Sequence, residues 1–274
     1  MDIKLCNKDD SMDLREFKDV SLDVREYFRK EDKTKQVLEF LGNMNEVFWQ
    51  SINLVHFVSE FVRKNIKHSI SLPVFILSNK FINHTVASYE MLLMHLENEQ
   101  VILYRQSLEV QWLIKYFIEN PNDIQPWLLD KDIYARQSRH AVDNNTTTKE
   151  LYKYLSSYSH PFSASKPQSH LGGLFIPEFT NSALARLLIS IKDMVEHLYE
   201  TIEKFGDINI QKIVENNIFN NEIEEYILIS YNELQELRKS IVILSYFENP
   251  DMVIDILEKN EDYEFINFLI ENYS

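Results

Sequence analysis

The stretch that decides the fold runs NHTVASYEMLLMHLENEQVILYRQSLEVQWLIKYFIENP, residues 83–121. Its apolar residues recur every three or four positions, which places them on one face of an α-helix. They form two series, Tyr89, Leu92, Leu93 and Leu96, then Val101, Tyr104, Leu108 and Trp112. The polar residues 97–100 separate the series, and Pro121 ends the second. We therefore predict two antiparallel helices, joined by a tight connection at residues 97–100.

Few residues that favour turns occur in the chain as a whole. It has 274 residues but only four glycines and seven prolines, and it contains neither GxxxxGK nor GxGxxG, the loops that cradle phosphates. Helical spacing also predicts one helix over about 37–67, another starting near Pro126, and a third over 181–204. The predicted fold is all-α, an up-and-down helical bundle with extra N- and C-terminal helices.

Charge divides the chain unevenly and suggests three parts. The net charge is −15, and residues 206–274 carry 15 acids against four bases, a net of −11. Residues 131–170, by contrast, have six Lys and Arg against three acids. We assign a charged N-terminal helical segment to residues 1–36, the helical bundle to 37–205 and an acidic helical region to 206–274.

Several classes of protein lack their usual signals here. Cys6 is the single cysteine, as is usual in a reducing compartment, and no basic-then-apolar leader or membrane-length apolar run occurs. We expect a cytoplasmic protein without membrane contact. The eight histidines are scattered, with no HExxH or Cys cluster, so we expect no metal and no cofactor.

Arg105 and Glu109 are the first chemical oddity. They are four residues apart and share a predicted helix face with Trp112 and Tyr116. One interpretation is an active-site pair; the other is a buried ion pair that fixes helix packing and needs further hydrogen bonds to offset desolvation.

The best place for a site is the segment that follows LYKYLSSYSHP, residues 151–161. It is rich in Pro, Gly and Ser to about residue 179, and a loop this long is usually functional or disordered. His160 fits either proton transfer or a capping role. Arg136 and Arg139 fit either contacts to a substrate or a solvated basic face.

Two short motifs carry a family resemblance. LYRQSLE, residues 103–109, and the later Tyr152-x-x-Leu155-Ser156 followed by His160 resemble a family of bacterial helical proteins allied to the HEPN superfamily (higher eukaryotes and prokaryotes nucleotide-binding). The likeness covers residues 75–204, and Asn98-Glu99 replaces the usual turn glycine. The Arg-x4-His spacing of HEPN ribonucleases also occurs, at Arg63 and His68, where it equally fits a basic helix C-terminus.

The resemblance implies a HEPN-like core, a homodimer and a metal-independent ribonuclease that acts on RNA or a nucleotide, as a toxin or phage-defence effector. Arg105 would bind phosphate, His160 would be the acid and base, and Glu109 would orient Arg105. Tyr152 or Tyr154 would position the substrate. Apart from the resemblance, Arg136 and Arg139 are further candidates for substrate binding.

The sequence leaves open whether the chain is an enzyme at all. The alternative is a non-catalytic interaction or regulatory protein, whose acidic region 206–274 binds a basic protein partner.

Overall fold

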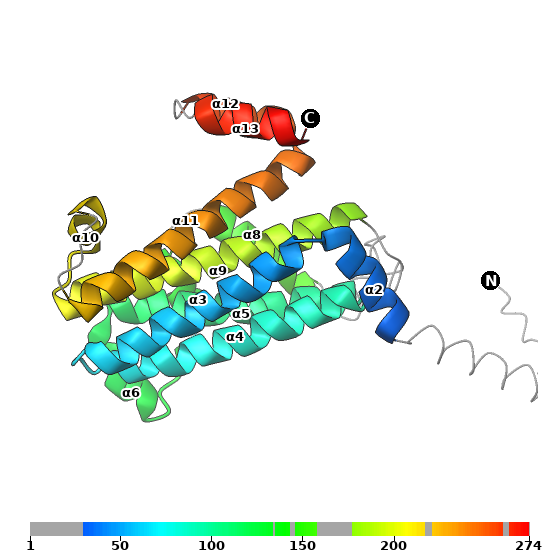
Figure 1. Ribbon diagram of the computed structural model, residues 1–274. Helices are drawn as coiled ribbons and strands as arrows, with labels where there is room; N and C mark the ends of the chain where they lie inside the picture. Colours follow the sequence, from blue (N-terminus) through cyan, green and yellow to red (C-terminus); the bar gives the residue numbers. More distant parts are fainter. Residues whose placement is uncertain are drawn as a thin grey trace, which may run out of the picture.

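The computed structural model describes residues 30–133, 135–142, 146–157, 177–216, 221–259 and 263–273. Every regular element in these ranges is helical, which confirms the all-α prediction (Figure 1). In chain order the α-helices are α2 (Lys30–Leu41), α3 (Met44–Asn65), α4 (Ser71–Leu93), α5 (Glu97–Glu119), α6 (Ile124–Leu128), α7 (Ala135–Val142), α8 (Thr146–Ser157), α9 (Pro177–Gly206), α10 (Ile210–Asn216), α11 (Glu222–Glu248), α12 (Pro250–Lys259) and α13 (Tyr263–Tyr273), with a 3₁₀ turn at Pro121–Asp123 before α6.

Five long helices, α3, α4, α5, α9 and α11, lie side by side and form the predicted helical bundle (Figure 1). The first three alternate in direction, because short connections join them. Helix α9 then runs parallel to α5, since α6 to α8 carry the chain back along the bundle. Three hydrogen bonds between α5 and α9 show this parallel direction, because the residue numbers of the partners rise together along both helices. Gln111 accepts from Ser190, Lys115 donates to Glu200, and the carbonyl of Ile118 accepts from Lys204.

One continuous apolar core fills the bundle, and all five long helices contribute to it. Phe48 of α3 and Tyr89 of α4 are fully buried and stack with ring centres 3.9 Å apart. The Tyr89 hydroxyl donates a hydrogen bond of 2.8 Å to Asn45 Oδ1, which satisfies its one polar atom. Helix α11 belongs to this core, because Ile227, Leu234, Leu237 and Leu244 are buried within it.

The turn between α4 and α5 differs from the prediction. Residues 97–100 form the first turn of α5 rather than the connection, which consists of residues 94–96. His95 has a φ of 58°, the left-handed conformation that reverses the chain without a glycine. Glu97 and Glu99 suit the first turn because the helix dipole favours negative charge there. Ser88 Oγ donates to the carbonyl of Gln100 at 2.9 Å and so fixes the register of α4 against α5.

Two other predicted helices are each divided in the structure. The helix expected over 37–67 breaks after Leu41, where Gly42 has a φ of 51°, and α2 therefore leaves the direction of α3. The helix expected from Pro126 onward is interrupted after Leu128, with Asp130 at a φ of 64°, before α7 begins.

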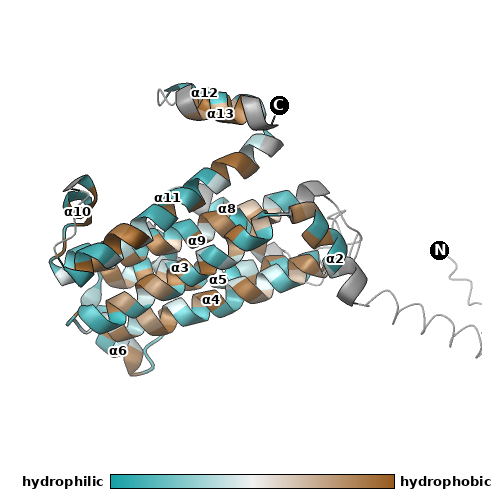
Figure 2. Cartoon of the chain, in the orientation of Figure 1, coloured by the Kyte–Doolittle hydropathy of each residue, from teal (hydrophilic) through white to brown (hydrophobic). Residues whose placement is uncertain are grey.

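The last two helices, α12 and α13, form what we call the C-terminal helix pair. They pack on the end of α11, where Tyr246, Val253, Leu257, Ile266 and Leu269 make a small second core. Brown, apolar residues on this pair lie apart from the main bundle (Figure 2). None of the helices in the described part of the chain is both long and apolar enough to cross a membrane.

Candidate functional site

Arg105 and Glu109 lie one turn apart on α5 and form an ion pair, with Nε and Oε1 separated by 3.2 Å. Their side chains are 22% and 30% exposed, so each is mostly covered by its neighbours but still reaches the surface. This is the geometry that spacing of four residues on a helix produces. The pair is therefore partly desolvated, and a charge placed there interacts more strongly than it would in bulk water.

Tyr152 of α8 brings the predicted residues together. The guanidinium carbon of Arg105 lies 5.6 Å from the centre of its ring, and that of Arg139 lies 5.2 Å from the same centre. Trp112 of α5 also contacts the ring, with ring centres 5.9 Å apart and planes tilted by 50°. Cations within about 6 Å of an aromatic ring are attracted to its face. We call Arg105, Glu109, Trp112, Arg139 and Tyr152 the arginine–tyrosine site.

Helix packing explains why these residues converge. Helix α7 packs along α5, and α8 also contacts α5, so two consecutive helices that follow α5 in the chain return to lie against it. Leu155, one turn after Tyr152, is buried in the main core and anchors α8 to the bundle. Leu151 and Tyr152 pack against the same core as partly buried residues. Tyr152 is thus held by its neighbours on both sides along the chain.

The structure does not place the other predicted residues in the arginine–tyrosine site. Tyr154 is 42% exposed, and two helical positions turn a side chain by about 200°, so it does not share the face of Tyr152. Arg136 lies in α7, one turn before Arg139, but its side chain is outside the described residues. His160 also lies outside the described residues, so its distance from Arg105 is not defined.

His84 of α4 is a site residue that the sequence did not single out. Burial lowers its pKa most, the Lys80 ammonium lowers it further, and the Glu109 carboxylate acts in the opposite sense. The net pKa is below the ordinary value, so the neutral imidazole is favoured. Glu109 is therefore close enough to act on both Arg105 and His84. Only the α4–α5 register, set at His95, creates this relationship.

The nuclease-like spacing at Arg63 and His68 has a structural explanation. Arg63 Nη2 donates to Glu60 at 2.8 Å, and its guanidinium lies 5.2 Å from the Phe75 ring centre. His68 accepts a hydrogen bond from the Ile70 amide at Nδ1 and stacks on Phe205. Both residues thus belong to the contacts at the ends of α3 and α9, which agrees with the helix C-terminus interpretation.

A second group of charges joins α5, α9 and α11. Lys115 Nζ lies 2.7 Å from Glu200, and Arg238 Nη2 lies 2.7 Å from Glu196. His197, between them on α9, is mostly buried, and burial lowers its pKa. Within the described ranges no group of three or more His, Cys, Asp and Glu side chains could hold a metal ion.

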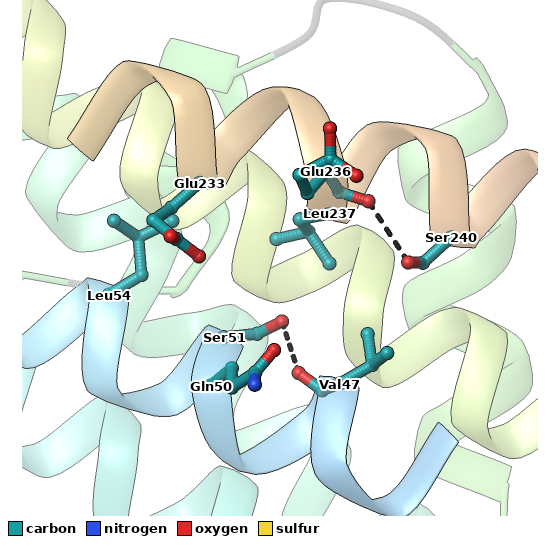
Figure 3. A pocket seen from close by; sticks show the side chains of 8 residues that line it. All are labelled: Val47, Gln50, Ser51, Leu54, Glu233, Glu236, Leu237 and Ser240. Atoms are coloured by element: carbon teal, nitrogen blue, oxygen red, sulfur yellow. Dashed lines mark hydrogen bonds between the residues drawn. The ribbon is translucent and has the colours of Figure 1, made fainter. Parts of the chain in front are cut away.

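In the described part of the chain, a smaller and a larger hollow border α11. The smaller, between α3 and α11, has a volume of about 30 Å³ and accommodates about two waters (Figure 3). Ser51 and Ser240 line it, and each hydroxyl bonds a carbonyl of its own helix. The larger, between α11 and the C-terminal helix pair, has a volume of about 720 Å³.

Comparisons of this chain with protein-family models, with curated proteins and with solved structures gave no match. The HEPN resemblance consequently stays a prediction that depends on the two motifs alone.

Proposed function

We propose that the arginine–tyrosine site binds the phosphate of an RNA or a nucleotide, and that this chain is a HEPN-like helical protein acting on that ligand. One observation carries the proposal: Arg105 of α5 and Arg139 of α7 both lie within 6 Å of the centre of one ring, Tyr152. Two guanidinium groups that contact one ring offer several N–H donors to a phosphate, and the aromatic ring can stack on a base.

The electrostatics favour an anion at this place although the chain as a whole is acidic. Residues 131–170, which include α7 and α8, carry a local net charge of +3. Lys80 is exposed on the neighbouring turn of α4, near enough to affect His84. Such a local basic face binds a short single strand or a nucleotide more readily than a duplex, which needs a broad basic surface.

The reaction we propose is metal-independent cleavage of RNA. Arg105 would hold the phosphate, and Glu109 would orient the guanidinium through their 3.2 Å contact. A histidine would move the proton: His160 by the family resemblance, or His84, whose pKa the Glu109 carboxylate acts to raise. A neutral imidazole can accept the proton of a ribose 2′-hydroxyl while the 2′-oxygen forms a bond to phosphorus. The bond from phosphorus to the 5′-oxygen then breaks, and the leaving 5′-oxygen takes a proton, which gives a 2′,3′-cyclic phosphate and a 5′-hydroxyl. The family resemblance further suggests a homodimer and a role in toxicity or phage defence.

A cleavage assay tests this function. Labelled single-stranded RNA is incubated with the protein in EDTA, and the rate is compared among the wild type, Arg105→Ala, His84→Ala and His160→Ala. We expect Arg105→Ala and one of the histidine variants to reduce the rate by about 100-fold or more, as removal of a proton-transfer group does. Arg63→Ala, which removes a charge engaged with Glu60, is the control and should keep the wild-type rate. Full activity in all variants that remain folded would contradict the proposal.

A further inference from the structure

The larger hollow borders the C-terminal helix pair and is built differently from the arginine–tyrosine site. Its volume is about 720 Å³, within the range of pockets that hold ligands. Its apolar lining is Val242 and Ile243 of α11, Leu257 of α12, and Phe265 and Phe268 of α13. Polar side chains of α11, among them Lys239, form the rest. The hollow therefore has an apolar surface with a polar margin.

The walls of the hollow are fixed by packing. Leu257 lines the hollow and also belongs to the small core, together with Val253 and Leu269. Phe265 and Phe268 stack with ring centres 5.7 Å apart. The position of α12 and α13 on α11 thus sets the shape of the hollow.

Large apolar side chains remain exposed on the C-terminal helix pair. Phe268 is 42% exposed, and Ile270 of the same helix is 46% exposed. On α12, Met252 and Ile256 are 48% and 47% exposed and lie one turn apart. Of these four, Phe268 lines the hollow itself, so an apolar side chain at the hollow is open to a partner.

Charge restricts what can occupy the hollow. Helices α12 and α13 contain five acids, Asp251, Asp255, Glu258, Glu264 and Glu271, against the single base Lys259. The bases on the α11 wall are already neutralised within the chain: Lys239 lies 2.8 Å from Glu236, and Arg238 lies 2.7 Å from Glu196. The helix pair that forms one wall of the hollow thus has a net charge of −4, five acids against one base, which disfavours nucleic acid, an anionic membrane or a second copy of the same acidic pair.

We infer that the hollow between α11 and the C-terminal helix pair is the docking site for a basic amphipathic helix of a partner protein. Its apolar face would lie against Phe265, Phe268 and Val242, while flanking Lys or Arg residues would meet the carboxylates of α12. This is the mode in which a helix binds in a groove through apolar residues at positions i, i+3, i+4 and i+7. The inference goes beyond the RNA proposal and does not depend on it.

A peptide titration tests the inference. The probe is a fluorescein-labelled peptide of Leu and Lys, about 18 residues or roughly five helical turns long, with Leu at helical spacing. Two matched peptides are used: one of the same composition with the Leu positions shuffled, and one with Glu in place of Lys. Anisotropy is measured with the full chain at low and high salt. We expect the first peptide to bind at least about tenfold more tightly than either other peptide, and less tightly as salt rises.

Paired variants locate the binding. Phe268→Glu places a charge on the apolar lining and should weaken binding by about tenfold or more. Ile229→Glu is the matched control, because Ile229 is 50% exposed on α11 but does not line the hollow. A double variant, Asp255→Asn and Glu258→Gln, removes two carboxylates of α12. It should weaken peptide binding by about threefold at low salt and by less at high salt, as expected for charges at the margin of an interface.

Three results would overturn the inference: no binding of the probe, equal binding of the shuffled peptide, or equal effects of Phe268→Glu and Ile229→Glu. A dimer that forms with rising protein concentration and is lost in Phe268→Glu would instead identify a second copy as the occupant. RNA binding is measured on the same variants, and Phe268→Glu should leave it unchanged. Failure of this inference can therefore be distinguished from failure of the RNA proposal.

Discussion

The guanidinium of Arg105 lies against the ring of Tyr152, with its carbon 5.6 Å from the ring centre, while Nε stays 3.2 Å from Glu109. This relationship connects α5 to α8 and gives the guanidinium contacts to both an aromatic ring and a carboxylate. A phosphate that approaches Arg105 thus meets a group whose orientation is already fixed, so less conformational entropy is lost when it binds.

Two substitutions at Tyr152 distinguish the contribution of its aromatic ring to RNA binding from that of its hydroxyl. Tyr152→Phe keeps the aromatic face, so we expect the affinity for labelled single-stranded RNA to stay within about twofold of the wild type. Tyr152→Leu removes the face and should weaken RNA binding by about tenfold, since stacking on one aromatic ring contributes roughly 1–3 kcal/mol. Fluorescence anisotropy measures both. Equal affinities for Leu and Phe at this position would mean that the ring takes no part in binding.

The charges around His84 predict opposite shifts in two variants. Lys80→Gln should raise the pKa of His84, because the ammonium lowers it, and Glu109→Gln should lower it further, because the carboxylate raises it. NMR titration of the imidazole measures both directions. Shifts of the same sign, or none, would show that these residues do not act on His84.

The same titration has a consequence for stability. His84 and His197 both have pKa values below the ordinary 6.5, so the unfolded chain binds protons more tightly than the folded one. Their titration therefore leaves stability unchanged well above pH 6.5 and reduces it as the pH falls through 6.5 and below.

Glu196 should make the α9–α11 contact sensitive to acid. Burial alone would raise its pKa, but hydrogen bonds from Arg238 and Lys192 outweigh this and lower it. A carboxyl whose pKa is lowered on folding stabilises the fold at pH values above its pKa in the unfolded chain, near 4.5. This contribution is lost as the pH falls through the pKa that the carboxyl has in the folded protein. We expect Glu196→Gln to lower the free energy of unfolding by about 0.2–1 kcal/mol near neutral pH, the usual value for a pair this exposed.

Urea unfolding at neutral and acidic pH measures that effect. The difference between Glu196→Gln and the wild type should shrink once the pH lies below the folded pKa of Glu196. Glu39→Gln is the control: its pair with Lys35 is 3.7 Å long and both side chains are mostly exposed, so stability should change little at either pH. A pH-independent cost for Glu196→Gln would point to lost packing instead of lost charge.

The sequence predicts the class of fold because local forces decide it. Glycine scarcity and helical spacing indicate an all-α bundle, and Arg105 and Glu109 could be paired from their separation of four residues alone. The contact between Arg105 and Tyr152 could not be derived in this way, because it depends on how α7 and α8 return across α5. His84 was missed for a related reason: the left-handed residue that sets the α4–α5 register is His95, where a glycine would be the usual signal.

The hollow between α11 and the C-terminal helix pair could not be predicted from the sequence either. The acidity of residues 206–274 is plain in the sequence, but α11 packs in the main core while α12 and α13 build a separate one. Only the position of that second core on α11 creates the hollow.

The most direct test of the central claim is a salt-dependent titration of labelled single-stranded RNA with the wild type, Arg139→Gln and Arg63→Gln. The two variants lose the same charge, but Arg139 lies 5.2 Å from the Tyr152 ring centre while Arg63 pairs with Glu60 elsewhere. If the arginine–tyrosine site binds phosphate, Arg139→Gln alone should weaken binding, by about tenfold, and reduce the slope of log affinity against log salt by about one. Equal affinities and equal slopes for the two variants would contradict a phosphate site at Tyr152.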